Sequence, residues 1–189
     1  MKIKIGVMGS SSAAAAAQNG DLGRALGEAI AAQEVILLTG ATTGLINLVG
    51  KTAREAGVFH IGISPGENQR EHAETFALPI DACDAMVYTG FGLKGRNVVL
   101  VRSCDVVLFI AGSIGSLNEF TIAHDEGKII GCLTGTGGVA DEIERIAATF
   151  KKPTRSRILQ ESDPVRLVDR CLKAFAELSP RDFPINKQG

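Results

Sequence analysis

One stretch of the chain, residues 105–119 (DVVLFIAGSIGSLNE), restricts the possible folds more than any other. Its apolar run from Val106 to Ile110 is typical of a buried parallel strand, and a loop of small residues follows directly. A helix is predicted over 116–126. The N–H groups of a first helical turn have no helical partner and carry the positive end of the helix dipole. The stretch therefore predicts an anion site, with Glu119 beside whatever group is joined to the anion.

The rest of the chain alternates apolar runs with amphipathic segments. Further strands are predicted over residues 2–8, 34–39, 58–64, 85–89, 128–133 and 158–160, and further helices over 21–33, 45–56, 93–103, 139–150 and 163–178. Strands that alternate with helices pair in parallel through right-handed crossovers. We therefore expect the α/β class, as a three-layer Rossmann-like fold with a mostly parallel sheet and helices on both faces.

Some segments carry weaker local signals. Asp21 is predicted to cap the helix over 21–33, and the alanine run from Ala13 to Ala17 is compatible with either a helix or a flexible tract. Residues 67–82 predict a polar loop. Arg102 and Asp105 are interpreted as a structural pair that flanks the central strand.

Length and composition exclude several classes of protein. The chain has 189 residues and a net charge of -1, so one domain over residues 1–189 is expected, with an irregular tail from about 179 and no nucleic-acid partner. No apolar run reaches the ~20 residues that span a bilayer, and no signal peptide is recognised. The four cysteines are scattered and have no histidine at metal-ligand spacing, so we expect no metal site and a reduced, cytoplasmic protein.

Small-residue turns follow the first, second and central strands. In parallel sheets a ligand lies outside the carboxyl ends of the strands, so these turns should converge on it. Small residues also let a phosphate approach the backbone closely. The candidate phosphate- or nucleotide-binding residues are Gly9, Ser10, Ser11, Gly40, Thr43, Gly44, Gly112, Ser113, Ile114, Gly115 and Ser116.

These motifs resemble a Rossmann-like group that contains the LONELY GUY phosphoribohydrolases, the proteins long called "lysine decarboxylases", and molybdenum-cofactor carriers. The group's PGGxGTxxE signature is similar to AGSIGSLNE (111–119), and its preceding helical arginine falls on Arg96. Its GGGxxGLMG element is similar to GATTGLIN (40–47). The resemblance runs from residue 3 to about 150 and is closest to a small bacterial branch that also resembles the cofactor carriers. The chain departs from the group's pattern at Ala41, Asn47, Ala111, Ser113 and Ser116.

The resemblance implies two functions. In the first, the protein hydrolyses the N-glycosidic bond of a nucleoside 5′-monophosphate, with Glu119 stabilising an oxocarbenium-like transition state and Arg96 holding the phosphate or the departing base. In the alternative, it is a non-catalytic carrier that binds a nucleotide or a phosphorylated pterin, the molybdenum cofactor. The residues leave open whether the chain is an enzyme.

Simpler roles exist for both residues, and one activity is rejected. Glu119 could only complement the helix dipole, and Arg96 could be a surface arginine paired with a neighbouring acid. No lysine is marked for a pyridoxal phosphate Schiff base, so lysine decarboxylation is rejected and no cofactor is expected. The partner should be a small nucleotide or phosphorylated molecule, not a membrane. The resemblance also implies a homodimer or higher homo-oligomer.

Overall fold

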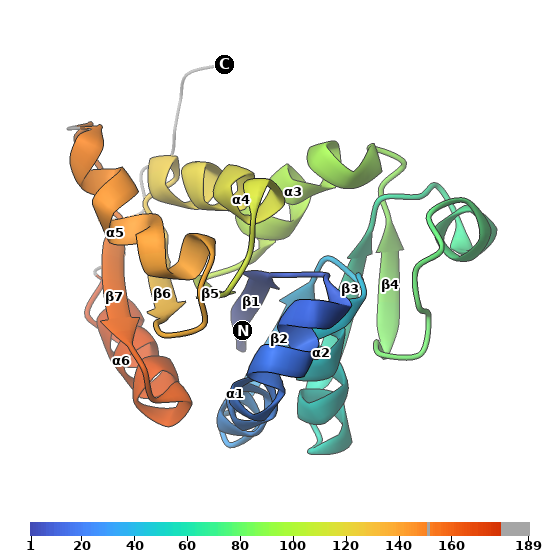
Figure 1. Ribbon diagram of the computed structural model, residues 1–189, viewed down its shortest axis with the longest axis horizontal. Coiled ribbons are helices and arrows are strands. Elements are labelled where there is room, and N and C mark those ends of the chain that lie inside the picture. The colour runs from blue at the N-terminus through green and yellow to red at the C-terminus, as the bar shows by residue number, and fades with distance from the viewer. Residues whose placement is uncertain (151, 179–189) are drawn as a thin grey trace.

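The computed structural model describes residues 1–150 and 152–178, and its centre is a seven-stranded parallel sheet in the order β4-β3-β2-β1-β5-β6-β7 (Figure 1). The predicted three-layer α/β class is confirmed, and the sheet is parallel throughout. The order reverses between β1 and β5, which is where such sheets open a crevice. The strands are β1 (Ile3–Gly9), β2 (Val35–Thr39), β3 (Phe59–Ser64), β4 (Ala85–Tyr88), β5 (Val106–Ile110), β6 (Ile129–Leu133) and β7 (Arg157–Glu161).

Helices cover both faces of the sheet. One face packs against α1 (Ala13–Ala31), α2 (Gly44–Glu55) and α6 (Pro164–Ala176), and the other against α3 (Gly92–Ser103), α4 (Ile114–Asp125) and α5 (Val139–Thr149) (Figure 1). Strand β5 contributes to both cores: Leu108 points into the first and Phe109 into the second. Burial on both faces is why this strand is an uninterrupted apolar run.

The prediction that Asp21 caps the first helix is wrong. Helix α1 begins at Ala13, and the N-cap is Ser12, whose hydroxyl accepts a hydrogen bond from the Ala15 N–H at 3.1 Å. Alanine has the highest helix propensity, so the alanine run from Ala13 to Ala17 extends the helix towards the N-terminus. A kink at Asn19 (φ -116°, ψ 19°) separates this added part from the predicted segment.

The polar segment over 67–82 is more ordered than the predicted loop. It contains a short π-helix, η1 (Glu71–Thr75), whose His72 is completely buried. The Ser64 hydroxyl and the His72 Nδ1 atom are 2.8 Å apart, and His72 Nε2 donates to the Pro79 carbonyl at 3.1 Å. A buried polar side chain with both nitrogens bonded is stable in a core, so His72 has a structural role here.

The predicted pair between Arg102 and Asp105 is also wrong. Asp105 accepts hydrogen bonds from both the backbone N–H (2.8 Å) and the ammonium group (2.7 Å) of Lys4 at the start of β1. Arg102 points outwards and pairs with Glu126 instead. The neighbouring strand, and not the preceding helix, supplies the partner of Asp105.

Three further features concern the cysteines, the length of the helices and the C-terminal tail. Cys104, Cys132 and Cys171 are buried, and burial raises the pKa of each thiol to about 12. Within residues 1–150 and 152–178, no helix is long and apolar enough to cross a membrane. The tail predicted from about residue 179 lies outside the described residues.

Candidate ligand-binding cleft

A polar cleft of about 250 Å³ opens at the carboxyl ends of β1, β2 and β5, beside the point where the strand order reverses. The three small-residue turns and the first half of α3 form its walls. The residues that line it are Val7, Met8, Gly9, Ser10, Ser11, Ser12, Gly40, Thr42, Ile46, Leu93, Lys94, Arg96, Asn97, Ser113, Gly115, Ser116 and Glu119. The turns therefore converge as the parallel topology requires.

Most candidate binding residues line this cleft, but four do not. Gly9, Ser10, Ser11, Gly40, Ser113, Gly115 and Ser116 line it together with Arg96 and Glu119. Ile114 points into solvent, 72% exposed. Thr43 and Gly44 support the wall: the Thr43 hydroxyl donates to the Ser11 carbonyl at 2.8 Å, and Gly44 packs on the Ser11 backbone at φ +66°. Gly112 packs against the Ser116 side chain.

The candidate residues leave out part of the lining, namely Val7, Met8, Ser12, Thr42, Ile46, Leu93, Lys94 and Asn97. Leu93, Lys94 and Asn97 share the start of one predicted helix with Arg96. Residues three or four apart lie on the same helix face, so helical spacing from Arg96 could have identified Leu93, which is three positions away, but not Lys94 or Asn97, which are two and one positions away.

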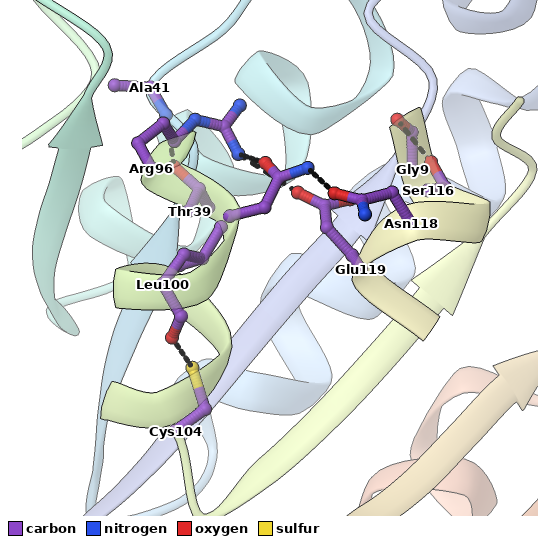
Figure 2. Close-up of polar contacts among 10 residues, drawn as sticks. Gly9, Thr39, Ala41, Arg96, Leu100, Cys104, Ser116, Asn118 and Glu119 are labelled. Atoms are coloured by element: carbon purple, nitrogen blue, oxygen red, sulfur yellow. Dashed lines mark hydrogen bonds and ion pairs between the residues drawn. The ribbon is translucent and has the colours of Figure 1, made fainter. Parts of the chain in front are cut away.

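Arg96 and Glu119 form a buried ion pair in the wall of the cleft (Figure 2). Arg96 Nη1 donates to Glu119 Oε1 at 2.9 Å and also to the Asn97 side-chain oxygen, and Asn97 Nδ2 donates to Asn118 Oδ1 at 2.8 Å. The Arg96 and Glu119 side chains are only 7% and 8% exposed. The interpretation of Arg96 as a surface arginine is therefore wrong.

Both members of the Arg96–Glu119 pair have hydrogen-bonding capacity that the protein does not use. Burial raises the pKa of Glu119, and the positive charge of Arg96 opposes that shift. Within the described residues, the Glu119 side chain makes no hydrogen bond other than the one to Arg96, and Arg96 Nε is buried without a partner. A carboxylate with spare acceptor capacity and a guanidinium with spare donors favour a polar ligand at this wall.

Gly40 makes room for the Arg96 guanidinium. A Cβ atom at position 40 would lie 2.2 Å from Arg96 Nη2 and 2.4 Å from Arg96 Cζ. We expect Gly40→Ala to displace the guanidinium and to lower the free energy of unfolding by about 1–3 kcal/mol, as overpacking usually does. Urea denaturation measures this. Gly20→Ala is the matched control, because its Cβ would meet only ordinary contacts at 3.6 Å or more; equal losses in the two variants would contradict this role of Gly40.

The other end of the cleft is the N-terminus of α4. The N-cap Ser113 makes no side-chain capping bond, so the first-turn N–H groups of α4 have no side-chain partner there. The Ser116 hydroxyl donates to the Gly9 carbonyl at 3.1 Å and so joins the two loops. Lys94 Nζ lies near the first turn of α4, 3.5 Å from where a Cβ of Gly115 would be. Together these features attract an anion.

Two alanines beside the cleft have left-handed backbones. Ala41 (φ 48°) follows β2 by two residues, and Ala111 (φ 51°) follows β5 directly. This conformation costs about 1–2 kcal/mol for a residue with a Cβ. Because proline is fixed near a φ of about -65°, the turn at Ala111 has a backbone that the proline of the PGGxGTxxE pattern would not allow.

Larger hollows lie away from the carboxyl ends of the strands. One of about 590 Å³ is mostly apolar and lies over α3, α4 and α5 beside Phe120 and Phe150. No group of three or more histidine, cysteine, aspartate or glutamate side chains that could hold a metal occurs within residues 1–150 and 152–178. The cleft, in contrast, combines the Arg96–Glu119 pair and Lys94 with the N-terminus of α4.

The chain matches one family model and is similar to several known proteins in sequence or structure. Residues 2–168 match the family model described as the SLOG cluster4 family. An uncharacterized protein of Archaeoglobus fulgidus is 30% identical over 108 residues, which cover 57% of this chain and 66% of that relative's length. The molybdenum cofactor carrier protein of Chlamydomonas reinhardtii is similar with a TM-score of 0.75 and 27% identity, over 94% of this chain and 100% of that one. The molybdenum cofactor binding protein of Rippkaea orientalis is similar with a TM-score of 0.69 and 26% identity, over 93% and 98%.

Proposed function

Because this chain belongs to the SLOG cluster4 family, we propose that it is a binding or carrier protein for a phosphorylated pterin of the molybdenum-cofactor type. The observation that carries the proposal is the likeness to two molybdenum cofactor proteins over more than nine tenths of the chain. In this proposal the cofactor is cargo, so it is held and released without chemical change.

The two ends of the cleft fit the two ends of such a ligand. The phosphate would bind at the N-terminus of α4, where Ser113 and Gly115 line the cleft and Lys94 adds a positive charge. The pterin edge presents N–H donors beside a carbonyl acceptor. The spare acceptor capacity of Glu119 and the spare donors of Arg96 match that edge.

Hydrolysis of a nucleoside 5′-monophosphate is the second candidate. It is favoured by the convergence of Arg96 and Glu119 on one wall of the cleft, since that reaction needs a cation and a carboxylate together. The burial and pairing of Glu119, however, make the same pair less suited to hydrolysis. Glu119 is nine tenths buried and one of its oxygens is already bonded to Arg96, which reduces the negative charge available to an oxocarbenium-like centre.

One experiment separates the two candidates. Purified protein is mixed with molybdenum cofactor released from a molybdoenzyme, passed through a desalting column, and assayed for molybdenum by mass spectrometry. In parallel, the protein is incubated with nucleoside 5′-monophosphates and free base is followed by chromatography. We expect about one molybdenum per chain and no base release. Glu119→Gln should weaken retention, and Glu126→Gln, a variant of an exposed carboxylate near the end of α4, should not.

The other results have clear meanings. Base release that disappears in Glu119→Gln would establish the hydrolase and overturn the carrier proposal. If the protein does not retain molybdenum and does not release base, both candidates are overturned.

The expected partners follow the same proposal. We propose a small phosphorylated ligand, a homodimer or higher homo-oligomer, and a cytoplasmic location; light scattering of the purified chain tests the oligomeric state.

A further inference from the structure

Thr136 lies in the loop between β6 and α5, is 3% exposed, and does not line the cleft. Its hydroxyl oxygen accepts a hydrogen bond from the Ala111 N–H at 2.8 Å and donates to the Leu133 carbonyl at 2.7 Å. Its own carbonyl accepts from Asn19 Nδ2, at the kink of α1, at 3.1 Å. Thr136 is therefore fixed by the core, and it fixes the first residue after β5.

The start of α5 holds the next two peptide groups of the same turn. The Ala140 N–H donates to the Ala111 carbonyl at 2.9 Å, and the Val139 N–H donates to the Gly112 carbonyl at 3.1 Å. All described peptide bonds are trans, so the Ser113 N–H points opposite to the Gly112 carbonyl and away from α5. Ser113 lines the cleft. Residues 136–140 therefore set the direction in which the turn presents its N–H groups.

These hydrogen bonds hold a conformation that alanine rarely adopts. Ala111 has φ 51°, in the left-handed region. The second strained alanine beside the cleft is held in the same way: the Ala41 N–H donates to the Thr39 hydroxyl oxygen at 3.2 Å, and Thr39 Oγ1 lies 2.8 Å from His60 Nε2 (Figure 2 shows Thr39 and Ala41). Since His60 Nδ1 donates to the Ala82 carbonyl, Nε2 accepts from Thr39. A strained alanine anchored by a buried threonine thus recurs in two turns, after β2 and after β5, that lead into the cleft.

We propose that Thr136 is a positioning residue of the anion site: its hydroxyl holds Ala111 in the left-handed conformation and so directs the Ser113 N–H towards the cleft. This rests on the proposed function, because it assumes that the cleft binds a phosphorylated ligand. It assigns a binding role to a residue that touches no ligand and lies 25 positions from Ala111 in the chain.

Two measurements test this on the full chain. The affinity for released molybdenum cofactor should fall about tenfold in Thr136→Val, which keeps the shape and removes the hydroxyl, and should return to nearly the wild-type value in Thr136→Ser. Amide hydrogen exchange at Ala111 should become faster in Thr136→Val. The matched control is Thr134→Val in the same loop, because the Thr134 side chain makes no hydrogen bond within the described residues.

A double variant separates positioning from general damage. Glycine adopts a left-handed backbone freely, so Ala111→Gly should reduce the loss of affinity caused by Thr136→Val. Unchanged affinity and unchanged Ala111 exchange in a folded Thr136→Val protein would overturn the proposal, as would a loss that neither Thr136→Ser nor Ala111→Gly reduces. If the wild type binds no cofactor, the proposed function fails, and the exchange measurement still decides whether Thr136 holds the turn.

Discussion

Replacing Ser113 by aspartate is expected to weaken binding of the phosphorylated ligand by at least about a hundredfold while leaving the protein as stable or more stable. Ser113 is exposed and is the N-cap of α4, without a side-chain capping bond of its own. An aspartate there can cap the helix and complement its dipole, which is worth about 0.3–1 kcal/mol. The same carboxylate would occupy the electropositive end of the cleft and repel a phosphate.

The opposite signs of the two effects make this variant informative. Cofactor retention and thermal unfolding are measured on the same preparation. Ser113→Asn is the control, because asparagine caps a helix equally well and adds no charge. Affinity within threefold of the wild type in Ser113→Asp would show that the phosphate does not bind at α4.

Removing Arg96 alone should be the most destabilising single change in the cleft. In Arg96→Ala, Glu119 stays buried without its partner, and breaking a buried pair from one side typically costs about 3–5 kcal/mol. Replacing both residues, as in Arg96→Met with Glu119→Gln, should cost less because no buried charge is left over. Urea unfolding of the two variants at neutral pH measures the difference.

The loss in free energy of unfolding caused by Arg96→Ala should also depend on pH. Burial already raises the pKa of Glu119 above its ordinary value of 4.5, and loss of Arg96 removes the strongest opposing charge. A raised folded-state pKa means that the folded chain binds a proton which the unfolded chain releases. The contribution of Glu119 to the stability of Arg96→Ala is therefore greatest below its unfolded pKa of about 4.5 and is lost as the pH rises towards neutrality. A small cost that does not vary with pH would mean that Glu119 finds another partner or water.

The sequence predicted the scaffold because the scaffold depends on local patterns. The run over 106–110 is apolar throughout since β5 is buried on both faces, and its predicted bounds are those of the strand. The helix predicted over 45–56 differs from α2 (Gly44–Glu55) by one residue at each end, and Gly57 takes φ +101° soon after the helix ends. Parallel strands bring their carboxyl ends to one edge, so three turns could be placed around one ligand site without any knowledge of distances.

Only the tertiary structure decided which side chains far apart in the chain come into contact. Arg96 and Glu119 are 23 residues apart, and their burial as a pair depends on how α3 and α4 sit over the sheet and on the space left by Gly40. Thr136 has no motif around it, and its bond to Ala111 exists because β6 lies next to β5. Periodicity and turn residues specify where elements begin and which face is apolar. They do not specify the register in which two helices or two loops meet, and that register determines which polar groups are paired and which remain free for a ligand.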